Sequence, residues 1–175
     1  MGAICGCAGT NTGAAPAPSQ QTVHVSTPSS GVGTLTITGN SPEATHTVAY
    51  SPEAVWRALP GVFDSIGVTV AAVDPDRRSM GNEAFKVRGR LKNTPLSRYI
   101  DCGNSTQIGP NADNYDVALT LIADVRPGDK GSAKVTTTFR AVAKPVNFSQ
   151  GYAECNSKGV LEDRFLEILK ARLAH

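Results

Sequence analysis

The sequence has no long hydrophobic run and little net charge, and both absences narrow the classes of protein it can encode. No stretch approaches the ~18 consecutive apolar residues typical of a membrane-spanning helix, so no such helix is predicted. The formal net charge is +2 at pH 7. That charge is too small for an overall field that would draw the chain to nucleic acid or to a membrane surface.

Motifs for catalysis are also missing from the sequence. The three histidines, His24, His46 and His175, lie in no pattern that would activate a nucleophile, and we interpret His46 as a surface or strand-edge residue. No phosphate loop, dinucleotide fingerprint or nucleophile elbow occurs. The run Asn111–Asp116 could hold calcium, but it lacks the glycine and distal glutamate of a calcium loop, so we interpret it as a solvated turn. We therefore predict no enzyme, no cofactor and no metal.

The four cysteines fall into two groups, and neither has the spacing of metal ligands. Cys5 and Cys7 lie in a glycine-rich start, whereas Cys102 and Cys155 lie at the boundaries of predicted elements. The second pair predicts a disulfide, and a disulfide indicates an oxidising compartment. The alternative is two separate buried thiols.

The first residues are similar to the end of a bacterial lipoprotein signal. Ile4, Gly6 and Cys7 match its aliphatic, small and modified positions, and Cys7 is the predicted lipidation site. The small, polar, proline-containing run that completes residues 1–20 is typical of a flexible tether. The alternative is an N-terminus with two incidental cysteines. Residues 21–42 alternate weakly and predict an extended arm or a small hairpin.

Residues 43–175 have the patterns of one globular domain. Ser51 to Glu53 are typical of a helix start, and Gly67 is typical of a helix stop, so a helix is predicted over 54–66. After Cys155, apolar residues at helical spacing predict a long final helix with a buried face; these are Leu161, Phe165, Ile168, Leu169 and Leu173. Strands are predicted over 44–50, 68–73, 83–92, 115–125 and 133–144, with a short helix over 94–102.

The order of these elements predicts an α+β fold. Strands joined by hairpins are antiparallel, and their one apolar face has to be covered by helices. We therefore expect an antiparallel sheet covered on one face by the long C-terminal helix and by the helix over 54–66.

One strand carries a row of cations. Alternation over 83–92 places Lys86, Arg88, Arg90 and Lys92 on the face of the sheet that the helices leave open. The functional interpretation is a docking face for an acidic protein surface or anionic headgroups, and the alternative is a solvated face that discourages edge pairing. Nucleic acid is not expected as a partner, because no aromatic residues alternate with the cations.

The pattern resembles the helix-grip domains of bacterial envelope lipoproteins, such as the C subunit of the outer-membrane β-barrel assembly machine. The likeness spans roughly 44–174 and is carried by Ser51–Leu59, by Gly67, by the final helix with Leu161 and Glu162, and by the lipobox-like start. It implies a non-catalytic accessory or structural subunit, lipid-anchored on the periplasmic side of a bacterial membrane and docked on a membrane protein complex. The alternative is a module that binds a small apolar ligand between sheet and helix, lined by Phe63, Phe139 and Phe165.

Overall fold

The computed structural model describes residues 20–25, 33–38, 43–146 and 151–174. The chain divides into two compact units, Met1–Thr38 and Gly39–His175. In the first unit, β1 (Gln20–Val25) and β2 (Gly33–Thr38) pair as an antiparallel hairpin, with Gln20 opposite Thr38. Cys5, Cys7 and the rest of the predicted tether up to residue 19 lie outside the described residues.

The second unit is built on one sheet. Its strands are β3 (Glu43–Val48), β4 (Ala72–Asp74), β5 (Ser79–Arg88), β8 (Ile100–Asp101), β11 (Asp116–Pro127), β12 (Ala133–Lys144) and β13 (Ala153–Ser157). Their order is β4-β5-β11-β12-β13-β8, and every pairing is antiparallel. β12 is bordered by β3 through its first half and by β13 near its end.

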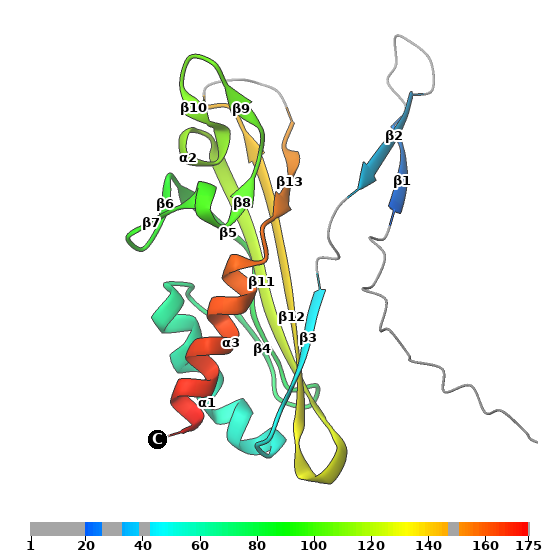
Figure 1. Ribbon diagram of the computed structural model, residues 1–175, viewed down its shortest axis with the longest axis vertical. Coiled ribbons are helices and arrows are strands. Elements are labelled where there is room, and N and C mark those ends of the chain that lie inside the picture. Colours follow the sequence, from blue (N-terminus) through cyan, green and yellow to red (C-terminus); the bar gives the residue numbers. More distant parts are fainter. Residues whose placement is uncertain (1–19, 26–32, 39–42, 147–150, 175) are drawn as a thin grey trace, which may run out of the picture. The chain divides into compact units, whose positions relative to one another are not determined.

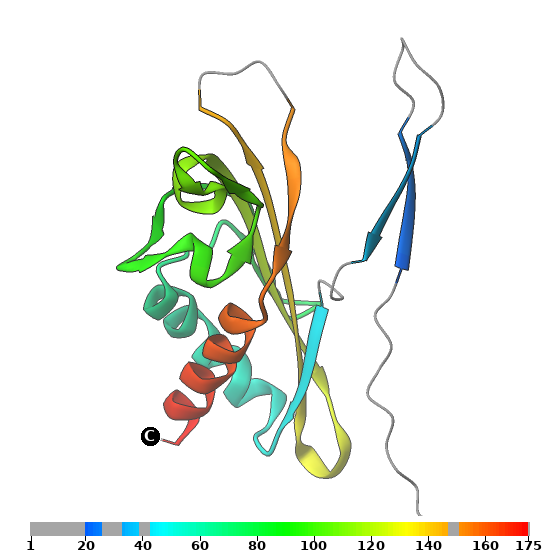
Figure 2. The ribbon, with the colours of Figure 1, turned by 45° about the horizontal axis from the view of Figure 1, so that its top comes forward.

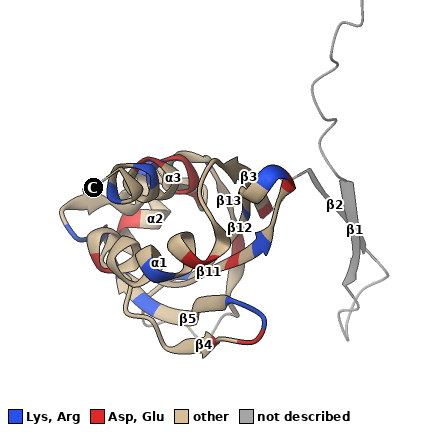
Figure 3. Ribbon diagram, turned by 90° about the horizontal axis from the view of Figure 1, so that it is seen from below, with Lys and Arg blue, Asp and Glu red and all other residues tan. Residues whose placement is uncertain are grey.

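Two long helices, α1 (Pro52–Ile66) and α3 (Val160–Leu173), lie on one side of this sheet (Figures 1 and 3). They run side by side and pack against each other (Figure 2). Burial alternates strictly along β11 and β12, because each strand turns every second side chain toward the helices. The predicted α+β class, with an antiparallel sheet and a C-terminal helix, is confirmed.

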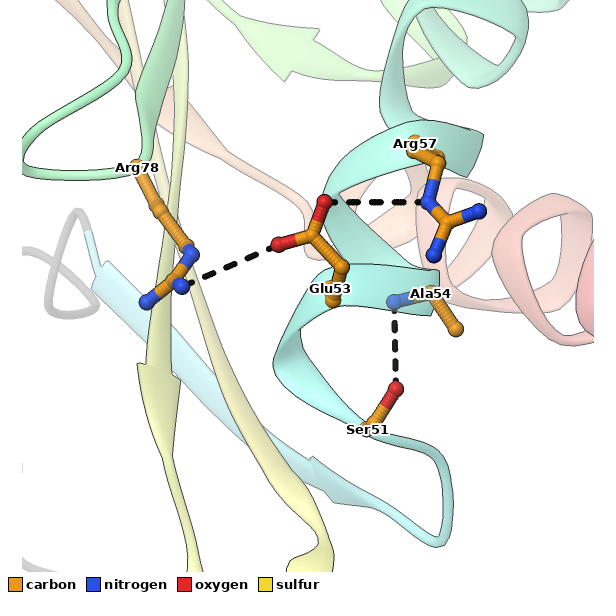
Figure 4. A network of polar contacts seen from close by, with 5 residues as sticks. All are labelled: Ser51, Glu53, Ala54, Arg57 and Arg78. Atoms are coloured by element: carbon orange, nitrogen blue, oxygen red, sulfur yellow. Dashed lines mark hydrogen bonds and ion pairs between the residues drawn. The ribbon is translucent and has the colours of Figure 1, made fainter.

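Capping residues fix both ends of α1. The Ser51 hydroxyl accepts a hydrogen bond from the Ala54 N–H at 3.2 Å, and Gly67 closes the helix in the left-handed conformation, with φ of 90°. Glu53 in the first turn lies 3.7 Å from both the Arg57 and the Arg78 guanidinium groups, and the three side chains converge in Figure 4. The ion pair between Glu53 and Arg78 links the start of α1 to the turn before β5.

The buried face of α3 is narrower than the sequence predicts. Leu161, Phe165 and Leu169 are buried, and the Phe165 ring meets Phe63 of α1 edge to face, with centroids 5.5 Å apart. Glu162, which is not one of the predicted buried residues, is buried as well. It accepts a hydrogen bond from the Ser157 hydroxyl at 2.6 Å, because the chain enters α3 directly from β13.

The part of the chain between β5 and β11 differs most from the prediction. We call Gly89–Tyr115 the connecting segment. In place of a short helix over 94–102 and a plain loop, it consists of short pieces: β6 (Arg90–Leu91), β7 (Thr94–Pro95), η1 (Leu96–Arg98), β8, β9 (Asn104–Ser105), β10 (Gly109–Pro110) and α2 (Asn111–Asn114). The strand predicted over 68–73 is also shorter, because only Ala72–Asp74 pair with β5.

Candidate docking surface

The face of the sheet opposite α1 and α3 is the candidate docking surface, and we call it the open face. Among the described residues of the second unit, no helix covers it, as the view along the sheet shows (Figure 3). On β11 and β12 it carries mostly small, polar and charged side chains, with Ile122 and Val142 among them, and all are half-buried or exposed. These include Asp116, Ala118, Thr120, Asp124, Lys134, Thr136, Thr138, Arg140 and Lys144.

The four predicted cations do not lie on one strand. β5 ends at Arg88, and Gly89 follows with φ of 70°, a left-handed conformation that turns the chain into the β6–β7 hairpin. Lys86 and Arg88 lie on the open face, since they pair with Ala118 and Asp116 of β11. The single four-residue row predicted over 83–92 is therefore wrong for its last two members.

Arg90 and Lys92 have structural contacts instead. The Arg90 guanidinium donates to the Asn93 carbonyl at 3.0 Å, inside its own hairpin. The Lys92 stem lies across the end of α1, where a Cβ atom at Gly67 would be only 2.5 Å from Lys92 Cγ. The last turn of α1 contains no basic residue, so Lys92 brings a positive charge to the negative end of that helix dipole.

A different cation completes the group on the open face. Asp116 lies opposite Arg88 on one side and Lys144 on the other, so three strands present alternating charges in one row. Arg88 Nε lies 4.0 Å from Asp116 Oδ1, and Lys144 Nζ lies 5.1 Å from the centroid of the Tyr152 ring. A shallow depression of about 280 Å³ is lined by Lys86, Val87, Arg88, Asp116, Val117, Lys144 and Tyr152.

Sequence reasoning missed Lys144, Tyr152 and Asp116 as neighbours of Arg88. The alternation of 133–144 was a usable signal for Lys144, because it places Lys144 on the same face of that strand as Thr136, Thr138 and Arg140. No sequence signal gives the register that sets Asp116 between two cations, since that register depends on how three strands align.

The predicted cysteine pair is joined in the structure. Cys102 and Cys155 lie at disulfide distance and link two positions 53 residues apart. Cys155 does not stand at the helix entrance, as predicted, but within β13, and Cys102 follows β8. The bond therefore fastens the connecting segment to the strand that leads into α3.

Polar side chains hold the connecting segment together around this bond. The Asp113 carboxylate accepts hydrogen bonds from the Ser97 N–H at 2.8 Å and from its hydroxyl at 2.7 Å. The Asn111 amide donates to the Cys102 carbonyl at 3.1 Å, and Asn114 donates to the carbonyls of Ile108 and Pro110. The run that reads as a solvated turn is thus a structural cluster: the Asp113 carboxylate and the amide groups of Asn111 and Asn114 are bonded within the segment, while Asn111 Oδ1 is buried without a hydrogen-bond partner.

The interior contains the three phenylalanines that were expected to line a ligand cavity. Phe63, Phe139 and Phe165 are all fully buried in the core beneath the sheet. Over the described parts of the chain, no group of three or more His, Cys, Asp or Glu side chains could hold a metal ion. In those same parts, no helix combines the length and the hydropathy needed to cross a membrane.

Comparison of the chain with protein-family models and with curated protein sequences gave no match. The resemblance to helix-grip lipoproteins therefore stays a prediction, and the functional argument depends on the geometry of the surface.

Proposed function

We propose that this protein is a non-catalytic accessory subunit, held by a lipid on Cys7 at the periplasmic side of a bacterial membrane, that docks on a membrane protein complex. The observation that carries the proposal is the contrast between the two faces of the sheet. One face is filled by apolar side chains under α1 and α3, and the other presents Lys86, Arg88 and Lys144 around a shallow depression. A charged, shallow, accessible surface suits contact with another protein more than the enclosure of a small substrate.

Two further features support the compartment and the architecture. The Cys102–Cys155 pair suits an oxidising environment such as the periplasm. The long α3 across an antiparallel sheet is the arrangement expected of a helix-grip domain, and we propose that class for the second unit. The burial of Phe63, Phe139 and Phe165 gives the alternative, an apolar ligand module, no specific support.

The anchor is tested by growing the bacterium that makes the protein with radiolabelled palmitate. We expect the native chain to incorporate label and to sediment with membranes. We expect Cys7→Ser to lose both properties, while Cys5→Ser, the matched control, keeps them. A native chain that stays unlabelled would overturn the anchor.

Docking is tested by gentle extraction of native membranes and purification of the tagged full chain. We expect a stoichiometric membrane protein partner that is lost when Lys86 and Lys144 are both changed to Glu. Exchange of Lys134 for Glu, on the same face but far from the depression, is the control. A chain that purifies alone would contradict the docking function.

A further inference from the structure

The edge of β5 is only partly covered by other strands. β11 pairs along β5 on one side, but on the other side β4 pairs only with Ser79, Met80 and Gly81. The Asn82 amide donates to the Thr69 carbonyl at 2.8 Å and closes the edge at that residue. Glu83 and Ala84 follow at a register shift in the β5–β11 ladder, where the Ala84 N–H donates to Asn82 Oδ1 at 3.3 Å. Beyond them, no other described strand of the second unit lies on this side of Phe85–Arg88, which we call the free edge.

The free edge has two different rows of side chains. Phe85 and Val87 pair with the buried residues Leu119 and Val117, so they turn toward the helices, where they are half-buried against the core. Lys86 and Arg88 turn to the open face and are exposed. A strand added along this edge would place every second side chain beside Phe85 and Val87. Its other side chains would lie beside Lys86 and Arg88.

The cations on the free edge have little compensation within the molecule. No ion pair involves Lys86 among the residues that the structure describes, and the only one made by Arg88 is the 4.0 Å contact with Asp116. Both side chains of that contact are well exposed, at 65% and 42%. An acidic side chain brought opposite Lys86 and Arg88 would therefore gain charge pairing and lose little.

The same charges select against a second copy of this chain. If β5 paired antiparallel with β5 of another molecule in the register that sets Lys86 opposite Arg88, like charges would face each other, which is destabilising across strands. Cations on an exposed edge are a common protection against such self-association. They leave the edge available to a segment of opposite charge.

We propose that the free edge of β5 binds an extended segment of a partner protein by strand addition, and that acidic residues alternate with apolar ones in this segment. Main-chain hydrogen bonds to Phe85–Arg88 would supply affinity, and the two side-chain rows would supply specificity. The inference depends on the proposed docking function for the existence of a protein partner, and it adds the place and the chemistry of the contact.

The test uses the full chain in native membranes, with p-benzoylphenylalanine placed either at Ala84, beside the free edge, or at Tyr152, which lines the depression of the open face. Both residues are exposed. We expect illumination to give at least tenfold more protein adduct from position 84. Mass spectrometry of that adduct should map to a segment with alternating acidic and apolar residues. Lys86→Glu should reduce the adduct at least tenfold, whereas Arg140→Glu on β12 should leave it unchanged.

Each of the other outcomes contradicts either strand addition or the docking function. An adduct from position 152 alone would place docking on the open face and overturn strand addition. An adduct from position 84 with lipid, or with a segment lacking the alternation, would also overturn it. No adduct from either position would contradict the docking function itself.

A second measurement tests the main-chain pairing. The mapped segment is synthesised as a peptide, and amide hydrogen exchange is followed in the purified full chain. We expect exchange to slow at least tenfold with the peptide at the amides of 85–88 that point away from β11, and to stay unchanged with a peptide methylated on alternate backbone nitrogens. Unchanged exchange with the unmodified peptide would overturn strand addition.

Discussion

The hairpin of β11 and β12 and the connecting segment are neighbours in the chain but are held by different interactions. The hairpin buries a continuous row of apolar side chains under α1 and α3. The connecting segment also buries Leu96, Tyr99 and Ile100, but its short pieces are tied by the Asp113–Ser97 hydrogen bonds and by one disulfide. The comparison teaches that one region is stabilised by apolar area, and the other by a few specific polar and covalent links.

The largest effect is expected from a cavity in the apolar region. Phe165→Ala removes the ring that packs on Phe63, and such truncations cost about 3 to 5 kcal/mol of the free energy of unfolding. Ile168→Ala, on the same helix but half-buried, is the matched control and should cost less than half as much. Urea denaturation measures both. Equal losses would show that burial along α3 is not as described.

The next effect is expected from the disulfide. Cys102→Ser with Cys155→Ser opens a closed loop of 53 residues, which in the chain-entropy model costs about 4 kcal/mol. In a domain of this size, such a loss lowers the melting temperature by about 10 °C. Hydrogen exchange should become faster first in the connecting segment, and β11 and β12 should stay protected. Uniform loss of protection would contradict the division into two regions.

A smaller effect is expected from the polar cluster. Asp113→Ala leaves the half-buried Ser97 N–H and hydroxyl without their acceptor, which costs about 1 to 3 kcal/mol. Asp116→Ala removes a carboxylate of the open face whose one ion pair is long and exposed, so it should change stability by less than about 0.5 kcal/mol. Thermal denaturation compares the two variants. A larger loss of stability from Asp116→Ala than from Asp113→Ala would contradict the structural role given to Asp113.

The smallest effect on stability is expected from the predicted cations, and it should differ between Lys92 and Lys86. Lys92→Glu places a negative charge at the end of α1 and should cost about 0.5 to 1 kcal/mol at low salt. Lys86→Glu should leave stability nearly unchanged, because the side chain is exposed and unpaired among the described residues, while it weakens docking. Chemical denaturation at two salt concentrations tests this. A salt-dependent loss from Lys86 and none from Lys92 would contradict it.

The sequence was informative where the spacing of apolar residues or a capping residue decides the local structure. The alternation of 133–144 and the capping residues Ser51 and Gly67 placed β12 and α1 almost to the residue. Phe165 and Leu169 were found on the buried face of α3 for the same reason. In these elements the local pattern and the packing agree.

The sequence was less informative where single residues and long-range register decide. Gly89 at positive φ ends β5, but a glycine within an alternating run reads equally well as strand. Glu162 is buried although the helical pattern does not require it: Ser157, five residues earlier, donates to Oε1, and Oε2 has no hydrogen-bond partner. Lys144 lies near Arg88 because three strands align in one register, and no short stretch of the sequence contains that alignment.

The edge of β12 that faces away from β11 is shared by β3 and β13, and this sharing has a consequence for the order of folding. These two strands come from opposite ends of the second unit, and the Thr137 hydroxyl reaches the Ala44 carbonyl across 93 residues. Contacts that are distant in sequence form slowly, because a long loop has to close before they stabilise the chain. We expect β11 and β12 to pair early as a local hairpin, and β3 and β13 to join later. During synthesis, the sheet can close only after most of this unit has emerged.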